Sequence, residues 1–196
     1  MQEVTLVING KPVTSEVDER TLLLEFIRDV AGYTGTHNGC LEARCGCCSV
    51  EVDGDIVKSC NVLAVQVSGR SITTVEGLSP QRVGPVEHIT TQSLAGMYAP
   101  LDALGADAST LHPLQAAFHR RHALQCGFCT PGMLMVLKDY LEDNPEPTRD
   151  DVRKAICGNL CRCTGYQHIV DATMDAAEVM RLESGLSASG ADVTDG

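Results

Sequence analysis

The sequence predicts an α+β protein, with a small mixed sheet crossed by one helix in its first part and a helical domain in its second. Three observations predict it. Extended runs separated by two-residue turn signals fill the first 78 residues. Helical periodicity takes over after residue 110. Ten cysteines are present, and eight of them form two groups, one in each part.

A β-hairpin is predicted at the start of the chain. Apolar residues alternate with outward positions, and Asn9-Gly10 then supplies a tight turn into a second run over residues 13–17. The alternating residues are Val4, Leu6 and Ile8. A second hairpin is expected where Asp53-Gly54 separates the runs 49–52 and 55–59.

A segment with helical spacing of its apolar residues lies between the two hairpins. It begins at Thr21 and stops at Gly32, and its apolar face is made by Leu23, Phe26, Ile27 and Val30. Two further extended runs, 62–67 and 71–75, complete a small sheet. A mixed sheet crossed by one helix, with a cysteine loop after that helix, predicts a β-grasp domain over residues 1–78.

Residues 79–110 carry several Pro and Gly residues among small residues and have no sustained period. They are predicted to form an irregular connector, either a tolerated insertion or a partner-binding surface. The last segment, 184–196, contains mostly Gly, Ser, Ala and Asp, and a flexible tail is expected there.

Four helices are predicted over residues 111–183. Pro113 opens the first, and Thr130 caps the second, which ends before Pro145. Thr148 with Asp151 resembles a capping box for the third, which runs through Ile156. The stripe of the fourth is formed by Ile169, Ala172, Thr173, Ala176, Ala177 and Met180. Small residues on these faces favour a compact four-helix bundle.

The first cysteine group reads C-x4-C-x2-C with a fourth cysteine shortly after, a spacing known for one [2Fe-2S] cluster in plant-type ferredoxins. Its predicted ligands are Cys40, Cys45, Cys48 and Cys60. Because Cys47 and Cys48 are adjacent, either could be the third ligand of the loop. The spacing from Cys45 favours Cys48, and Cys47 is interpreted as a small packing residue. Zinc is the main alternative metal, although three cysteines in one loop fit an iron cluster better.

The second group consists of Cys126, Cys129, Cys161 and Cys163. Each pair abuts a predicted helix end, so a bundle could bring the two pairs together around a second cluster. By composition alone, zinc stays credible for this group. Cys157 falls in the last turn of the third helix and is expected to pack rather than bind metal.

Composition excludes several functions. The net charge is −11, with no basic stripe, which argues against nucleic acid. No segment approaches about 18 unbroken apolar residues and the N-terminus has no leader pattern, so no membrane contact and a cytoplasmic location are expected. Thiols stay reduced in that compartment, which favours metal binding over disulfides. We find no nucleophile elbow, phosphate loop or H-E-x-x-H helix, so no substrate site is expected on this chain.

Several segments together resemble the small iron–sulfur subunit of molybdenum hydroxylases, the family of xanthine dehydrogenase, aldehyde oxidoreductase and bacterial carbon monoxide dehydrogenase. The resemblance covers about residues 3–182 except the connector. The segments are Thr34–Cys40, Cys45–Cys48, Lys58–Cys60, Thr74–Leu78, Leu111–Pro113, Gln125–Met133 and Gly158–Tyr166. Two features depart from the family: Cys47 stands where a small non-ligand residue is usual, and the connector is longer.

The resemblance implies a plant-type ferredoxin domain and a four-helix domain, each with one [2Fe-2S] cluster. It implies a non-catalytic electron-transfer subunit that relays electrons from a molybdenum cofactor of the molybdopterin type, in a large subunit, to FAD in a medium subunit. A dimer of such heterotrimers is expected. Gln125 and Cys129 are implied as the contact with the pterin. The alternatives are a stand-alone two-cluster ferredoxin for another redox system and a zinc-stabilised interaction module. The substrate is not readable from this chain.

Overall fold

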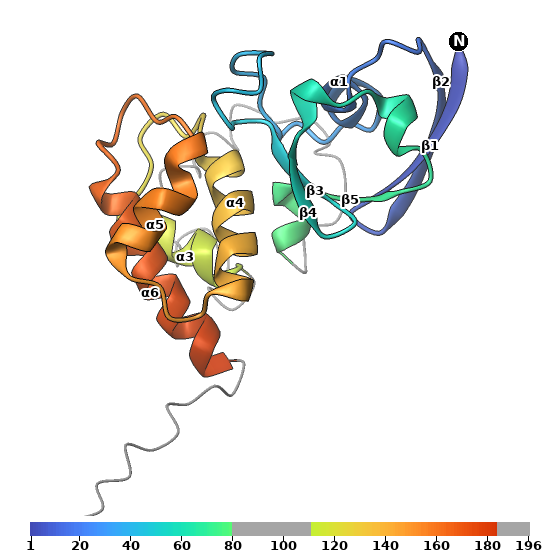
Figure 1. Ribbon diagram of the computed structural model, residues 1–196. Coiled ribbons are helices and arrows are strands. Elements are labelled where there is room, and N and C mark those ends of the chain that lie inside the picture. Colours follow the sequence, from blue (N-terminus) through green and yellow to red (C-terminus); the bar gives the residue numbers. More distant parts are fainter. Residues whose placement is uncertain (80–110, 184–196) are drawn as a thin grey trace, which may run out of the picture.

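A computed structural model of the chain describes residues 1–79 and 111–183. The described residues form a sheet domain and a helical domain that lie side by side (Figure 1). The expectations of a connector beyond Ser79 and of a tail over residues 184–196 fall outside the described residues.

Five strands form one mixed sheet in the order β2-β1-β5-β3-β4. They are β1 (Gln2–Ile8), β2 (Lys11–Val17), β3 (Ser49–Val52), β4 (Asp55–Lys58) and β5 (Ser71–Thr73). The pairs β1–β2 and β3–β4 are the two predicted hairpins. β5 lies between them, parallel to β1 and antiparallel to β3, which gives the β-grasp arrangement.

The crossing helix is shorter than predicted. One α-helical turn, α1 (Leu23–Glu25), continues as a π-helical turn over Phe26–Val30, in which the N–H of Ala31 donates to the carbonyl of Phe26 at 2.9 Å. Four side chains of this segment are buried, namely Leu23, Leu24, Phe26 and Ile27, and all of them except Leu24 pack in the core of the sheet domain. The predicted contact with the first hairpin is present, because those three side chains share a core with β1.

Two predicted extended runs are partly wrong. Residues 62–67 do not join the sheet: Ala64–Val67 form a 3-10 helix. The side chain of Gln66 accepts a hydrogen bond from the N–H of Leu63 at 2.9 Å, and this cap starts the turn. The last run also ends early, at Thr73, and Val75–Leu78 form another 3-10 helix.

The helical domain consists of α3 (Pro113–Arg120), α4 (Thr130–Asp143), α5 (Arg149–Ala155) and α6 (Gln167–Glu183). The capping box of Thr148 and Asp151 at the start of α5 is present. Thr130, in contrast, is not the cap of α4: the helix begins at this residue, and Cys129 occupies the cap position. The Thr130 hydroxyl is buried without a hydrogen-bond partner.

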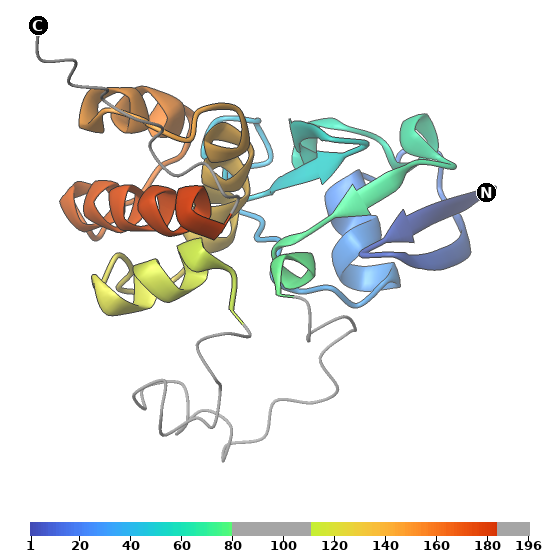
Figure 2. The ribbon, with the colours of Figure 1, turned by 90° about the horizontal axis from the view of Figure 1, so that it is seen from below.

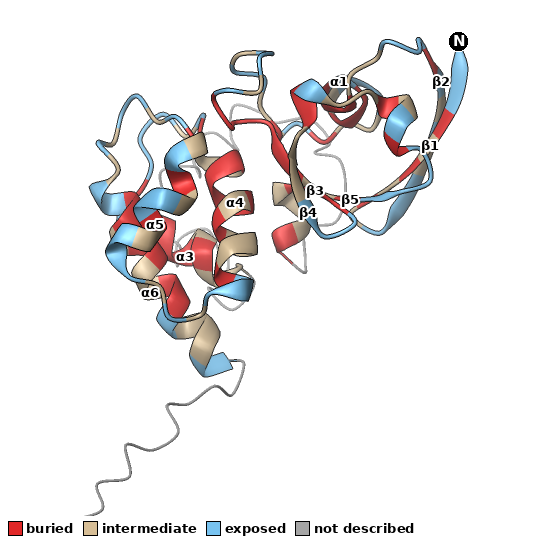
Figure 3. Ribbon diagram, viewed as in Figure 1, coloured by how far each residue is buried: buried red, intermediate tan, exposed pale blue. Residues whose placement is uncertain are grey.

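Each domain has its own apolar core (Figure 3). In the sheet domain the core lies between the sheet and α1. In the helical domain α4 lies among the other helices and buries Met133, Met135 and Leu137 completely. Cys45 and Cys47 of the sheet domain belong to this second core, so the first cysteine group lies at the boundary between the domains.

The two domains are in direct contact through α4, which packs against β3 and β4. The Lys138 ammonium of α4 lies 2.7 Å from the Glu51 carboxylate of β3, and both side chains are less than one-fifth exposed. The view from below shows α4 between the sheet domain and α6 (Figure 2). None of the described helices is long and apolar enough to cross a membrane.

Candidate metal centres

The first cysteine loop (residues 39–48) is shaped to present N–H groups to sulfur. Leu41 and Ala43 both adopt positive φ, at 57° and 56°. The N–H groups of Glu42 and Cys45 point at Cys40 Sγ, each at 3.4 Å. Successive N–H groups turned inward in this way form a site for anions. The hydrogen bonds from Cys45 and then Glu42 lower the pKa of the Cys40 thiol to about 6, so this loop favours a thiolate.

The fourth predicted ligand of the first group reaches the loop from the end of β4. Cys60 and Cys48 pack together with Leu24, and both cysteines are buried. Burial raises the pKa of Cys48 to about 11, while the side chain of Cys60 interacts with it directly. Cys40 interacts with Cys45, mainly through the Cys45 N–H, which gives a second pair, and Cys45 also interacts with the side chain of Cys47.

Cys47 packs in a different cluster from Cys60. It is 4% exposed, belongs to the core of the helical domain, and its Sγ lies 3.9 Å from the carbonyl oxygen of Cys45. Burial raises its pKa to about 12. The structure thus places Cys48, and not Cys47, with Cys60.

The second group is also arranged in two pairs. Cys126 and Cys163 are exposed, and their sulfurs lie 3.5 Å apart. Cys129 is buried, which raises its pKa to about 12, and its side chain interacts with that of Cys161. Each pair therefore contains one cysteine of the C-x2-C motif and one cysteine of the C-x-C motif.

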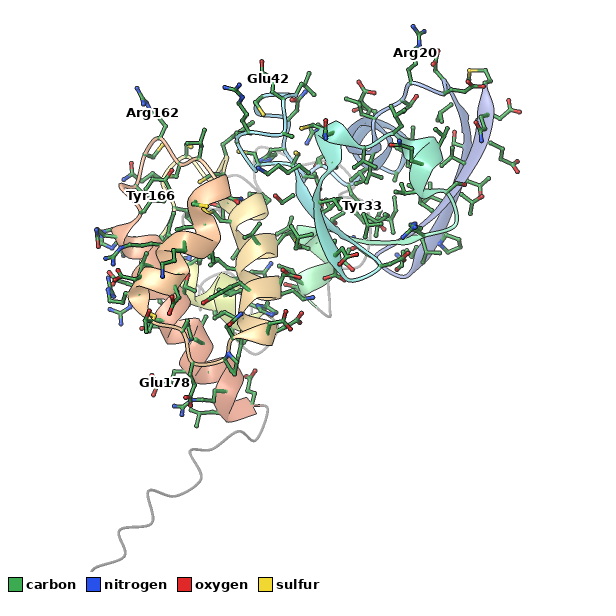
Figure 4. All side chains as sticks on the ribbon, viewed as in Figure 1. Arg20, Tyr33, Glu42, Arg162, Tyr166 and Glu178 are labelled. Carbon is green, nitrogen blue, oxygen red and sulfur yellow. The ribbon has the colours of Figure 1, made fainter. Side chains whose placement is uncertain are left out.

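Cys161 is surrounded by donors. Burial raises its pKa, but hydrogen bonds from Thr164 and from the Cys163 N–H outweigh this effect, and the net shift is downward. The Thr164 hydroxyl lies 3.0 Å and its N–H 3.4 Å from Cys161 Sγ. Tyr166 fixes the same loop, since its hydroxyl accepts from the N–H of Cys161 at 2.8 Å (Figure 4).

These pairs fit the needs of a [2Fe-2S] cluster, in which each of two irons takes two thiolates. Two thiolates bound tetrahedrally to one metal at about 2.3 Å lie about 3.7 Å apart, close to the 3.5 Å between Cys126 and Cys163. Within residues 1–79 and 111–183, no group of three His, Cys, Asp or Glu side chains has the geometry of a single-ion site.

The first cysteine loop touches the second cysteine loop (residues 158–165). The N–H of Leu160 donates to the carbonyl of Cys45 at 2.8 Å, and the buried Asn159 amide donates to the carbonyl of Gly46 at 3.2 Å. Gly46 has φ +72°, and a Cβ there would lie 2.6 Å from the carbonyl oxygen of Gly158. This close approach requires glycine.

The remaining predicted site residues differ in exposure. Gln125 is exposed beside the second group, whereas Cys129 is buried and the exposed sulfurs there belong to Cys126 and Cys163. Cys157 is exposed, so its expected packing role is wrong. Glu42 and Arg162, at the tips of the two loops, point away from both domains (Figure 4).

Sequence reasoning did not predict the contacts around the loops, although the residues that make them lie in the segments that carry the family resemblance. His37 stacks on Phe128 with ring centroids 4.7 Å apart, and its Nδ1 lies 2.8 Å from the Phe128 carbonyl oxygen. Lys58 donates to carbonyls of both cysteine loops. His37 lies shortly before the first cysteine loop, and Phe128 lies between Cys126 and Cys129. No spacing rule links residues that are 91 positions apart in the sequence.

Comparisons with known proteins agree with this arrangement. The family model of the 2Fe-2S iron-sulfur cluster binding domain matches residues 6–72. The model of the [2Fe-2S] binding domain matches residues 101–174.

Three relatives align with this chain along most of their own length. The chain is 43% identical to the nicotine 6-hydroxylase small subunit of Paenarthrobacter nicotinovorans over 174 residues, 89% of this chain and 88% of that one. It is 42% identical to caffeine dehydrogenase subunit gamma of Pseudomonas sp. (strain CBB1), over 86% of this chain and 87% of that one. A chain of quinoline 2-oxidoreductase from Pseudomonas putida 86 superimposes with a TM-score of 0.74 at 41% identity, over 94% of this chain and 97% of that one. The chain therefore belongs to the family of small iron–sulfur subunits, with two [2Fe-2S] domains, of the molybdenum hydroxylases.

Proposed function

We propose that this chain is a two-cluster relay between a molybdenum cofactor and FAD, both held by partner subunits. The observation that carries the proposal is the contact between the two cysteine loops, in which one hydrogen bond joins the Cys45 carbonyl to the N–H of Leu160, next to Cys161. When bound, two [2Fe-2S] clusters supply one-electron storage at each site. The chain itself contributes thiolates, N–H donors to sulfur and a fixed spacing between the sites.

The proposed ligands of the first cluster are Cys40 with Cys45 on one iron and Cys48 with Cys60 on the other. Those of the second cluster are Cys126 with Cys163 and Cys129 with Cys161. The pairwise packing of these thiols supports the assignment. Cys47 is left out of it, because Cys48 and not Cys47 packs with Cys60.

The proposed domains are the ferredoxin domain over residues 1–78 and the helical domain over 111–183. Their separate cores support this division. The intervening connector, 79–110, is proposed to join them without supplying a ligand.

The proposed partners are a large subunit with the molybdenum cofactor and a medium subunit with FAD, in a dimer of heterotrimers. The relatives named as small, gamma or beta subunits support separate partner chains. On the molybdenum side, the exposed position of Gln125 supports its proposed contact with the pterin. Cys129 is also proposed to contribute to this contact, and its side chain is buried. We place the complex in the cytoplasm, which suits a chain whose ten cysteines are all free.

Isolation of the native complex tests this proposal. Purified complex should contain about four irons per copy of this chain, and reduction should give two distinguishable EPR signals. Cys48→Ser and Cys163→Ser should each remove one signal and leave the other. Mass spectrometry of the co-purified subunits identifies the partners. Zinc in place of iron, or a stable chain with no flavoprotein or molybdoprotein partner, would contradict the proposal.

A further inference from the structure

Lys58 lies at the end of β4 and reaches both cysteine loops. Its Nζ donates to the carbonyl oxygen of Ala43 at 2.8 Å and to that of Gly158 at 3.3 Å. Ala43 lies inside the first cysteine loop, and Gly158 opens the second cysteine loop (residues 158–165). One ammonium group therefore holds the main chain of both loops, which are 100 positions apart in the sequence.

The charge of Lys58 is not neutralised by a side chain. Among residues 1–79 and 111–183, no carboxylate lies within ion-pair distance of its Nζ, whose partners are the two carbonyl oxygens. The other lysine that joins the two domains differs in this respect: Lys138 lies 2.7 Å from Glu51 and 2.9 Å from Glu142. Within the described part of the chain, the positive charge between the two loops thus has carbonyl partners but no carboxylate partner.

We propose that Lys58 is a potential-setting residue shared by both [2Fe-2S] sites. Reduction adds one negative charge to a site, and a nearby positive charge in a partly buried setting stabilises the reduced form. Lys58 therefore raises the reduction potential of both sites. Its hydrogen bonds to Ala43 and Gly158 also fix the spacing of the two loops, as residues around a metal site commonly do.

The inference rests on the proposed function, in which this chain holds two [2Fe-2S] sites, and the unaltered complex tests that function separately. If the unaltered complex contains about four irons and gives two EPR signals, both sites are present and the role of Lys58 can be measured. If it contains no iron, the proposed function fails before Lys58 is tested.

The experiment is a potentiometric titration of the complex with dithionite, followed by EPR, for the variants Lys58→Met, Lys58→Gln and Lys58→Arg. Methionine removes the charge and both donors. Glutamine removes the charge but keeps an N–H donor, and arginine keeps the charge. Lys138→Met combined with Glu51→Gln is the control, because it removes a lysine from the domain interface together with a carboxylate paired with it, so the net charge does not change. Iron content is measured for every sample.

We expect Lys58→Met and Lys58→Gln to shift the reduced-to-oxidised ratio of both sites about three- to tenfold toward oxidised, or about 28–59 mV for a one-electron couple. Lys58→Arg and the double variant Lys138→Met/Glu51→Gln should leave the reduced-to-oxidised ratio of both sites within twofold of the ratio in the unaltered complex. If Lys58→Met loses iron, the reduction potentials of Lys58→Gln and Lys58→Arg are compared instead, and this comparison tests the role of the charge. Unchanged potentials in Lys58→Gln, or an equal fall in Lys58→Arg, would overturn the proposal.

Discussion

The contact between α4 and the first cysteine loop gives a prediction whose sign depends on the fold. Gly132 lies in the first turn of α4. In an isolated helix, replacing glycine by alanine stabilises by about 0.5–1 kcal/mol. Here a Cβ at residue 132 would lie 3.0 Å from Cys47 Cα and closer still to the carbonyl oxygen of Gly46. Both neighbours are main-chain atoms that no side-chain rotation can move.

The size of the effect follows from these contacts. Ordinary contact begins at 3.4 Å, so α4 would have to move at least 0.4 Å, the difference from 3.0 Å, away from Cys47. Overpacking of this kind costs about 1–3 kcal/mol. For a chain of this size, Gly132→Ala should lower the melting temperature by about 2–12 °C.

The assay is thermal unfolding of the iron-loaded chain, with iron content measured on the same samples. Gly158→Ala is the control, because its Cβ would lie in ordinary contact, 3.5 Å from Lys58 Nζ, and it should change the melting temperature little. A melting temperature of Gly132→Ala that is unchanged or raised would refute the close approach of α4 to the first cysteine loop.

Three further predictions concern single side chains. Cys47→Ser should keep about four irons per chain and Cys48→Ser about two, as measured by iron analysis, and the reverse result would place the ligand at Cys47. Lys138→Met should lower the free energy of unfolding by about 3 kcal/mol, because it leaves the mostly buried Glu51 carboxylate unpaired, and adding Glu51→Gln should restore part of the loss in denaturant titrations. Burial lowers the pKa of His112, whose neutral ring caps α3. Just below pH 6.5 the unfolded chain therefore binds more protons, and the free energy of unfolding decreases as the pH is lowered. His112→Asn keeps a cap and should remove that slope in melting curves taken from pH 5 to 7.5; a slope that persists would assign the effect to another group.

Local sequence signals predicted most of the elements. The two hairpins follow from Asn9-Gly10 and Asp53-Gly54, whose residues all adopt positive φ. The α5 cap follows from the spacing of Thr148 and Asp151. Residues 62–67 were predicted as a strand because β-branched residues dominate there, but the Gln66 cap and the pairing of Leu63 with Leu22 give a 3-10 helix instead. Long-range pairing outweighed propensity at this segment.

The sequence by itself determined the chemistry of this protein, because the spacing of cysteines within each loop limits which thiols can reach one cluster. The tertiary structure alone decided how the two loops meet. Lys58 with Gly158, Asn159 with Gly46, and Gly132 with Cys47 are contacts between residues more than 80 positions apart. No local pattern encodes them, since they arise only when α4 packs against β3 and each domain brings its own loop to the boundary.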